Sequence, residues 1–581
     1  MSLANAAIDY YPSGYSTAGK PLMGREVANE AFLQAFFRHG EVDRFYCLAK
    51  AEADFDPFAA ACRKLREDRA AVWLPRHEPA SPAAPGCLFR GDPVLGELAW
   101  RRRQHDERAY SLCGVTHTTC TQAVMDALGG LLTEPLHEWD AIVCTSQAVK
   151  ATVEQILAGW ADYLRGRLGA CAPPRVRLPV IPLGVDAAAF DDPHRERTRL
   201  AVRRTLGIHA EEFVALYVGR LAFHAKAHPW QLYLSLERAA AHARKSFCLI
   251  QMGWFANAEI EAEFKVRARQ LCPRVKTLFI DGNRPEFRRR IWPAADVFIS
   301  LADNIQETFG LTPVEAMAAG LPVVVSDFNG YKDTVRHGID GFRVPVVTPA
   351  AGAGTELARR YERGEDDYDR YIGGVSLCTA IDINACASYL VQLAADSALR
   401  TSLGRSGRQR VQNQYDWRHV IRAYQELWHE LAGIRRSGVA AEARCDGPSD
   451  QFVPQSAWQA PRSSSLSNPL RPDPFALFAG YPTAQFDGAA TFVGCAGGER
   501  RLVEMYEAPM MNFAPALFAT LAECRQLLEF MAGDARSLDE LLAAGVLTDL
   551  SCLERTLAWL LKGGVLALAP FAKTRPVPCP D

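Results

Sequence analysis

One stretch, from Ser300 to Val325, constrains the fold more than any other part of the chain. It reads SLADNIQETFGLTPVEAMAAGLPVVV. A β-like run, DVFIS, ends at Ser300, and a polar loop containing Gly310 follows it. A short apolar helix then stops at Gly-Leu-Pro, and a second β-like run covers 323–325. The order strand, loop, helix, strand predicts a βαβ unit whose loop faces the carboxyl end of a parallel sheet, where open α/β sheets bind ligands.

The loop and the helix of this unit carry groups that suit a sugar nucleotide. The helix is expected to begin near Leu311 and Thr312, where unpaired N–H groups and the positive end of the helix dipole favour a phosphate. Gly310 lets the backbone approach a ligand closely. Glu307 and Glu315 flank this turn, and carboxylates accept hydrogen bonds from hydroxyl groups. An isolated pair of this spacing is more often a solvated loop residue and a helix-surface charge, but the whole pattern favours hydroxyls at both ends with a diphosphate between them.

Composition and charge narrow the class of protein. A chain of 581 residues is long enough for about three domains. Its net charge of −2 gives no general attraction to nucleic acid or membrane. No basic start followed by an apolar stretch, and no run of about 20 apolar residues, is present, so neither a signal peptide nor a membrane span is expected. The 16 cysteines include no C-x-x-C pair, which predicts reduced core cysteines in a cytosolic protein and no zinc site.

The amino-terminal part contains a glycine-rich loop that leads into a helix. Residues 13–20 are polar and rich in glycine, and PLMGR then opens a helix predicted over 26–38. A glycine loop at a helix amino terminus is an anion-binding arrangement, although a single such loop is weak support. Gly24 is the candidate residue, with Gly19 and Lys20 as nearby alternatives.

A histidine at the end of a predicted strand is a second candidate in this part of the chain. The segment CGVTHT is expected to be a short strand that ends in a polar turn at His117. A single histidine is usually structural. Its position at the carboxyl end of a strand, where α/β sheets place their chemistry, favours a functional role for His117.

Two short basic runs and one acidic pattern have less specific interpretations. The runs are RKLR at 63–66 and RRR at 101–103. A solvated helix face is the favoured interpretation for both, and a patch for an anionic lipid-linked or polyanionic acceptor is the alternative. The D-x-D pattern at 54–56 lies in a stretch rich in Phe and Pro that we expect to be a loop. It has no other ligands nearby, so we interpret it as incidental.

A second pair of charged residues follows a fully apolar strand in the middle of the chain. The run FVALYV at 213–218 is typical of a parallel strand buried on both faces. Gly219 after it permits a tight turn, and Arg220 and Lys226 place two cations at the carboxyl edge of the sheet. A diphosphate leaving group needs such cations, because negative charge grows on the phosphate oxygens as the glycosidic bond breaks. His224 is a minor alternative to the lysine.

The segment ETFGLTPVEAMAAGLP, from Glu307 to Pro322, resembles the signature of the large retaining GT-B glycosyltransferase family, also called group 1 or family 4. The resemblance covers residues 10–435 approximately. It implies an α/β protein of the GT-B type, with two Rossmann-like domains that face a cleft. It also implies a metal-independent hexosyltransferase that needs no cofactor besides its nucleoside diphosphate sugar donor.

The resemblance assigns roles to single residues. Glu315 would hold the ribose hydroxyls and Glu307 those of the donor sugar, while Arg220 would neutralise the diphosphate together with Lys226. The family's lysine usually lies one position closer to the arginine than Lys226 does. Gly24 would face the diphosphate across the cleft. The implied catalytic residues are His117, Arg220, Lys226 and Glu307, and the implied substrate-binding residues are Gly24, Phe309, Gly310, Leu311 and Glu315.

The remaining sequence divides into further predicted parts. The boundaries are 1–195 for an acceptor-side domain, 196–410 for a nucleotide-sugar domain, 403–435 for a helix that braces the first domain, 436–474 for a flexible linker and 475–581 for a tail. Residues 351–385 are longer than the family needs, and we interpret them as an insertion. The tail shows three helical segments and a short strand, which resembles a winged-helix domain. It lacks the basic face that DNA binding needs, so we expect a small, mainly helical module for protein interaction or self-association.

The expected function is therefore that of a retaining glycosyltransferase in glycan or polysaccharide biosynthesis. Its expected partners are a nucleotide-sugar donor and a glycan, lipid-linked or protein acceptor, and no nucleic acid. Its expected location is the cytoplasm or the inner face of the membrane. Two alternatives stay open: a sugar-nucleotide epimerase or hydrolase of the same fold, and a non-catalytic scaffold that binds a sugar nucleotide and acts through the tail.

Overall fold

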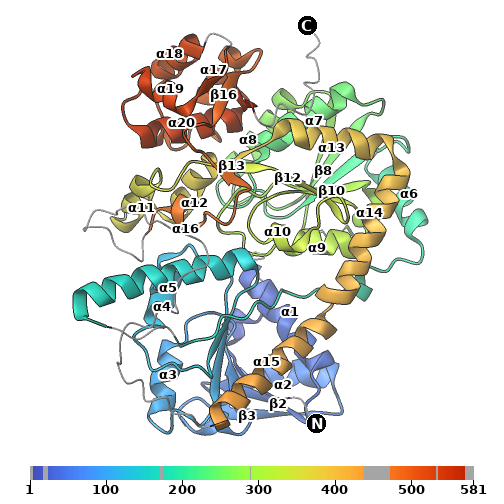
Figure 1. Ribbon diagram of the computed structural model, residues 1–581. Helices are drawn as coiled ribbons and strands as arrows, with labels where there is room; N and C mark the ends of the chain where they lie inside the picture. Colours follow the sequence, from blue (N-terminus) through green and yellow to red (C-terminus); the bar gives the residue numbers. More distant parts are fainter. Residues whose placement is uncertain are drawn as a thin grey trace. The chain divides into compact units, whose positions relative to one another are not determined.

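The computed structural model describes residues 4–16, 24–170, 175–284, 286–287, 289–437, 472–531 and 534–569. The chain forms two compact units, the first from Met1–Ala187 and Gln412–Arg471 and the second from Ala188–Val411 and Pro472–Asp581. Each unit contains a six-stranded parallel sheet, shown in blue tones for the first and in green for the second (Figure 1). The protein therefore has an α/β fold with two Rossmann-like units.

The sheet of the first unit has the strand order β3-β2-β1-β4-β5-β6, which is the order typical of a Rossmann fold. Its strands are β1 Ala7–Asp9, β2 Arg44–Ala49, β3 Ala70–Pro75, β4 Cys87–Phe89, β5 Ser111–Val115 and β6 Ala141–Val143. Its helices are α1 Gly24–His39, α2 Glu52–Leu65, α3 Gly96–Arg103, α4 Gln122–Gly130, α5 Gln147–Leu168 and α15 Trp417–Ser437. The D-x-D pattern at 54–56 lies within helix α2, so its assignment to a loop was wrong.

The sheet of the second unit has the strand order β12-β11-β10-β7-β8-β9. Read from the β9 edge, this is the same arrangement as in the first unit. Its strands are β7 Phe213–Val218, β8 Phe247–Gly253, β9 Val275–Asp281, β10 Val297–Ser300, β11 Val323–Ser326 and β12 Gly341–Val344, with β13 Val346–Thr348 and β14 Ala380–Ile381 in a second, small sheet. Its helices are α6 Arg195–Thr205, α7 Pro229–His242, α8 Ala258–Leu271, α9 Leu311–Ala318, α10 Tyr331–Thr334, α11 Thr355–Glu362, α12 Tyr368–Leu377, α13 Ile383–Ala395 and α14 Ser397–Arg410. The predicted βαβ unit is β10, α9 and β11, and β10 pairs in parallel with β11.

The first unit ends at Ala187, ahead of the predicted boundary at 195. The reason is local contact with the second unit's own elements: the Phe190 ring meets that of Trp292, and Asp191 forms an ion pair with Arg408. The stretch 351–385, interpreted from sequence as an insertion, supplies α11 and α12 to the second unit.

The helix that was predicted to run through 403–435 is two helices. Helix α14 belongs to the second unit, α15 belongs to the first, and a π-helical turn over Val411–Tyr415 lies between them. The backbone of Val185 interrupts the helix by bonding to both sides of Asp416, at Tyr415 and Trp417. Helix α15 packs into the core of the first unit, where aromatic side chains dominate. These include Phe32, Phe36, Phe89, Trp417, Tyr424 and Trp428.

Arg102, the middle residue of the arginine run at 101–103, has neither of the two predicted roles. Arg102 is fully buried and forms two hydrogen-bonded contacts with Asp140, at 2.6 and 2.8 Å. The Arg102 guanidinium also donates to the carbonyl oxygens of Tyr110 and Pro135. Its neighbour Arg103 is exposed and pairs with Glu107, as a solvated helix face would. Arg102 therefore holds α3 to the sheet and is part of no surface patch.

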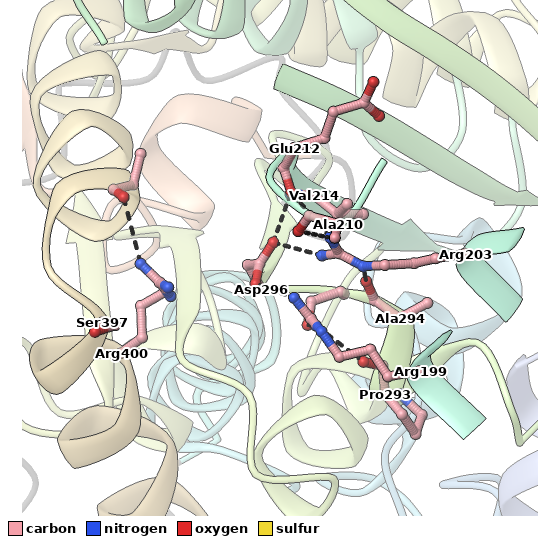
Figure 2. A network of polar contacts seen from close by, with 12 residues as sticks. Arg199, Arg203, Ala210, Glu212, Val214, Pro293, Ala294, Asp296, Ser397 and Arg400 are labelled. Atoms are coloured by element: carbon pink, nitrogen blue, oxygen red, sulfur yellow. Dashed lines mark hydrogen bonds and ion pairs between the residues drawn. The ribbon is translucent and has the colours of Figure 1, made fainter. Parts of the chain in front are cut away.

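A second arginine cluster fastens α6 to the amino edge of the second unit's sheet (Figure 2). Asp296, which precedes β10, accepts from Arg199 at 2.6 Å, from Arg203 at 2.7 Å and from the N–H of Val214 at 2.8 Å. Burial raises the pKa of Asp296, but the two arginine charges and the hydrogen bonds outweigh burial and hold it below its usual value. This network lies at the edge opposite to the one where Arg220 and Glu307 follow their strands.

The carboxyl-terminal segment is part of the second unit. Its elements are α16 Pro474–Leu477, β15 Ala484–Gln485, β16 Thr491–Gly494, α17 Gly498–Glu507, α18 Leu521–Met531, β17 Arg536–Ser537, α19 Leu538–Ala543, α20 Leu550–Gly563 and β18 Leu566–Leu568. Strand β15 pairs with β13, so this segment extends a sheet of the second unit. The predicted module over 475–581 is therefore joined to the second unit, and its separate role stays a prediction. The predicted linker at 436–474 falls mainly outside the described residues.

Within this segment, three helices and the strand that follows them match the predicted pattern of elements. Helices α18, α19 and α20 are followed by β18, and the sheet order is β17-β16-β18. The central strand β16 precedes these helices in the chain. The likeness to a winged helix stays a prediction.

Two global properties complete the description. None of the helices in the described ranges combines the length and the apolar character that crossing a bilayer requires. The cysteines in the described part of the chain are all free, and most are buried, Cys495 and Cys552 being half-buried.

Candidate functional site

The site in the second unit is built on the carboxyl ends of β7 and β10. Arg220 follows β7 after Gly219, and the loop 301–310 follows β10. Because β7 and β10 pair in parallel as neighbours, both segments leave the sheet at the same edge. This edge is where the sequence predicted a ligand.

Lys226 and Glu307 form the centre of this site. The Lys226 Nζ lies 2.5 Å from Glu307 Oε2, and the two side chains are 31% and 12% exposed. Burial raises the pKa of Glu307, but the Lys226 charge, its hydrogen bond and the backbone N–H groups of Thr308 and Phe309 together hold the pKa below its usual value. Glu307 is therefore ionised at neutral pH, and both side chains are partly exposed.

Arg220 is joined to this pair through the backbone of the loop that carries Lys226. Its Nη2 donates to the carbonyl oxygen of Ala225 at 2.8 Å, and the same oxygen accepts from Gln306 Nε2 at 2.7 Å. The Arg220 guanidinium also lies 5.9 Å from the centre of the Trp254 ring. The structure thus brings Arg220, Lys226 and Glu307 together, as the sequence predicted. His224, the alternative to the lysine, instead lies 3.6 Å from Asp369.

Gly310 shapes the turn into helix α9. It has φ +88° and forms the cap of the helix, so a residue with a side chain would be strained there. A Cβ atom at this position would also lie 2.0 Å from the Tyr331 ring. The Tyr331 hydroxyl is 2.9 Å from Ser300 Oγ, which fixes that ring above the end of β10. A glycine is therefore required on two independent grounds.

The amides around this turn differ in what they bond to. The Phe309 N–H is used within the protein, because it hydrogen-bonds the Glu307 carboxylate. Leu311 and Thr312 are the first residues of α9, so their N–H groups have no partner inside the helix. Pro313 follows without an N–H. An anion would therefore meet the amides of Gly310, Leu311 and Thr312 rather than that of Phe309.

Glu315 lies on the second turn of α9. Burial raises its pKa to about 7. Its carboxyl group takes part in none of the hydrogen bonds and ion pairs of the described residues. A carboxylate with a raised pKa and no partner in the protein is suited to accept hydroxyl groups from a ligand.

The first unit contains two residues that the sequence predicted to be functional. His117 follows β5, and its Nε2 lies 3.1 Å from the carbonyl oxygen of Gly91 and 3.2 Å from Asn29 Oδ1. Burial, followed by the charge of Arg25, lowers the pKa of His117 to about 4, so the ring is neutral at pH 7. Because a carbonyl oxygen only accepts, Nε2 carries the proton and Nδ1 is left as an acceptor.

Gly24 is the exposed first residue of α1, and a Cβ atom there would meet no described atom within 4 Å. The structure thus gives no local reason for glycine at this position. The alternatives Gly19 and Lys20 lie outside the described residues. Sequence reasoning also missed Gln306 and Tyr331, which position Arg220's loop and the helix turn. The only signal for Gln306 was its place next to Glu307, and no signal pointed to Tyr331.

The family comparison concerns the segment that holds this site. Residues 199–370 match the model of the family described as "Glycosyl transferases group 1". We call residues 199–370 the group 1 segment. Arg220, Lys226, Glu307 and Glu315 all lie within the group 1 segment.

Known proteins similar to the chain carry related names. An uncharacterized glycosyltransferase of Methanocaldococcus jannaschii is 27% identical over 176 residues, which is 30% of this chain and 43% of that protein. A D-inositol 3-phosphate glycosyltransferase of Geodermatophilus obscurus is 27% identical over 335 residues, 56% of this chain and 68% of that protein. For most of these relatives the chain spans about half of their length or less. The solved structure of Anabaena HepE with UDP and glucose is 16% identical with a TM-score of 0.47, and the match covers 73% of this chain and 100% of that one.

Proposed function

We propose that the protein is a retaining glycosyltransferase that moves a hexosyl group from a nucleoside diphosphate sugar to an acceptor hydroxyl. The observation that carries this proposal is the Lys226–Glu307 pair, 2.5 Å apart beside the amino terminus of α9 and inside the group 1 segment. It places a cation, a carboxylate and helix N–H groups at one sheet edge.

Each group has a role in the proposed reaction. Negative charge grows on the diphosphate as the bond from sugar C1 to the phosphate oxygen breaks. This charge would be stabilised by Arg220, by Lys226 and by the amides of Gly310 and Leu311. Glu307 would accept hydroxyls of the sugar. The acceptor oxygen then bonds to C1, and its proton leaves with the diphosphate or to solvent. Retention of the anomeric configuration and independence of metal belong to the proposal through the family resemblance.

Glu315 and His117 complete the proposed donor contacts. Glu315 would accept hydrogen bonds from the ribose hydroxyls, since its carboxyl group has no partner in the protein among the described contacts. The neutral His117 would offer Nδ1 to a hydroxyl near the transferred sugar. A role in glycan or polysaccharide biosynthesis belongs to the proposal through the family resemblance.

A product analysis tests this proposal. Nucleoside diphosphate sugars, each labelled in the sugar, are incubated with the protein alone and with a panel of hydroxyl acceptors, with and without a chelator. We expect acceptor-dependent transfer that the chelator does not abolish, with the anomeric configuration of the donor kept in the product by NMR. Free sugar or an epimer as the main product, whether or not an acceptor is present, would favour the hydrolase or epimerase instead.

A further inference from the structure

The carboxyl-terminal helix α20 is buried along most of its length within the second unit. From Leu553 to Gly563 its residues are buried, and it contacts α7, α12 and β14. The Trp230 Nε1–H on α7 donates to the carbonyl oxygen of Gly563 at 3.2 Å. Helix α20 is therefore a core element of the unit that carries the donor site.

Near its end, α20 places a lysine against the loop that carries Glu307. The Lys562 ammonium is fully buried and forms an ion pair with Asp303, and it donates to the carbonyl oxygen of Ser376 at 2.8 Å. Asp303 lies between the end of β10 and Glu307 in the loop 301–310. Lys562 thus bonds, through Asp303, to one arm of the proposed site.

The same carboxylate is bonded to the other arm. Asp303 Oδ1 accepts the backbone N–H of His228 at 3.1 Å, and His228 lies two residues after Lys226. The His228 ring in turn contacts the carbonyl oxygen of Met510, in the carboxyl-terminal segment, at 2.8 Å. One buried carboxylate therefore ties the segments of Lys226 and Glu307 to each other and to the tail.

The ion pair between Lys562 and Asp303 is energetically important because both charges are buried. Burial lowers the pKa of Lys562 and raises that of Asp303, and each charge offsets part of this effect on the other. A buried charge that loses its partner is strongly unfavourable, so the loop would have to move or Asp303 take up a proton. Either event would shift the segments on which Lys226 and Glu307 sit.

We propose that Lys562 is a positioning residue of the donor site, holding the Lys226–Glu307 pair in register through Asp303. The carboxyl-terminal segment is on this account a working part of the transferase. The kinetic consequence rests on the proposed function, whereas the structural consequence does not. A shift of about an ångström in a reacting group can lower a rate by about 10²-fold.

The test uses two single variants of the full chain, Lys562→Met and Asp303→Asn. Asp303→Asn keeps an oxygen for the His228 N–H and is the milder change, so it carries the test if Lys562→Met does not fold. The first readout is amide hydrogen exchange, which needs no ligand. We expect at least tenfold faster exchange in peptides covering 220–228 and 301–310, with the strands of the first unit unchanged.

The second readout is kinetic and separates positioning from general instability. At a temperature where the variants are folded, we expect kcat/KM for the donor to fall by 10-fold or more while KM for the acceptor stays within about twofold. Arg525→Met is the matched control, because it removes an exposed ion pair with Glu499 in the same segment and should change neither readout.

Two outcomes are decisive. Unchanged exchange in 220–228 and 301–310 in a folded variant would overturn the inference, whatever the activity of the protein. Unchanged donor kinetics in a folded variant of an active enzyme would overturn it as well. If the wild-type protein is inactive but its variants show the faster exchange, the positioning role of Lys562 is supported and only the proposed function is contradicted.

Discussion

Replacing Glu307 by glutamine should lower kcat/KM for glycosyl transfer by about 10²- to 10³-fold, which is the usual cost of removing one well-placed group that stabilises a transition state. The carboxylate of Glu307 forms an ion pair with Lys226 Nζ at 2.5 Å and accepts hydrogen bonds from the N–H groups of Thr308 and Phe309. Glutamine keeps the size of the side chain but removes its charge. Lys226 then loses its partner and is no longer held beside the diphosphate. The donor sugar loses a charged acceptor for its hydroxyls at the same time.

Steady-state kinetics with saturating acceptor measure this effect. The matched control is Glu286→Gln, because Glu286 is an exposed glutamate of the same unit that pairs only with the neighbouring Arg284 among the described contacts. Its kcat/KM should stay within about twofold of wild type. A Glu307→Gln enzyme with wild-type kcat/KM would mean that the Lys226–Glu307 pair is structural, and the proposed roles of both residues would be withdrawn.

Asp140→Asn should destabilise the first unit by about 3–5 kcal/mol, the cost expected when a buried ion pair loses one partner. Asp140 is fully buried, and its two oxygens accept from Arg102 at 2.6 and 2.8 Å and from the N–H groups of Leu112 and His137. Asparagine leaves the buried Arg102 charge without compensation. For a unit of this size the change corresponds to a melting transition lowered by about 10 °C.

Calorimetry of the full chain, read at the transition of the first unit, measures this loss. The double variant Arg102→Met/Asp140→Leu leaves no buried charge unpaired and should recover part of the stability, although the N–H groups of Leu112 and His137 lose their acceptor. Asp162→Asn is the surface control, because Asp162 pairs with Arg165 in the open and should cost less than about 1 kcal/mol. A loss no larger than that of Asp162→Asn would contradict the burial of the Arg102–Asp140 pair.

Local patterns predicted the parts of the fold that depend on local physics. The apolar run at 213–218 became the buried strand β7, and the stretch from Ser300 to Val325 became β10, α9 and β11. Gly310 stands at the predicted helix start, because only a residue without a side chain fits beside Tyr331. The convergence of Arg220, Lys226 and Glu307 followed from one rule, that neighbouring parallel strands end at the same edge of the sheet.

Most of the errors concern contacts between residues far apart in the chain. A run of three arginines looks solvated from sequence, and nothing nearby shows that Asp140 lies opposite Arg102. The break between α14 and α15 depends on the backbone of Val185, which no helical pattern reveals. The contacts of Lys562 and of strand β15, which join the tail to the second unit, were likewise not visible in the sequence. Composition shifts do not reveal where a segment packs.

The central claim is that the second unit binds a nucleoside diphosphate with Glu315 accepting the ribose hydroxyls. Calorimetric titration of nucleoside diphosphates at pH 8 and pH 6, on wild type and on Glu315→Gln, tests it most directly. Burial raises the pKa of Glu315 to about 7, so its carboxyl is ionised at pH 8 and mostly protonated at pH 6. Only the ionised form accepts fully, so wild-type affinity should fall about tenfold on that decrease in pH.

Inorganic pyrophosphate is the control, because one of its phosphate protons titrates in the same pH range and it has no ribose. Its affinity should change equally with pH in wild type and in Glu315→Gln, and the variant should bind nucleoside diphosphates with only that residual pH dependence. The account predicts saturable binding of at least one nucleoside diphosphate, with an extra tenfold pH effect that Glu315→Gln removes. No saturable binding of any of them, or a pH dependence unaltered in Glu315→Gln, would contradict it.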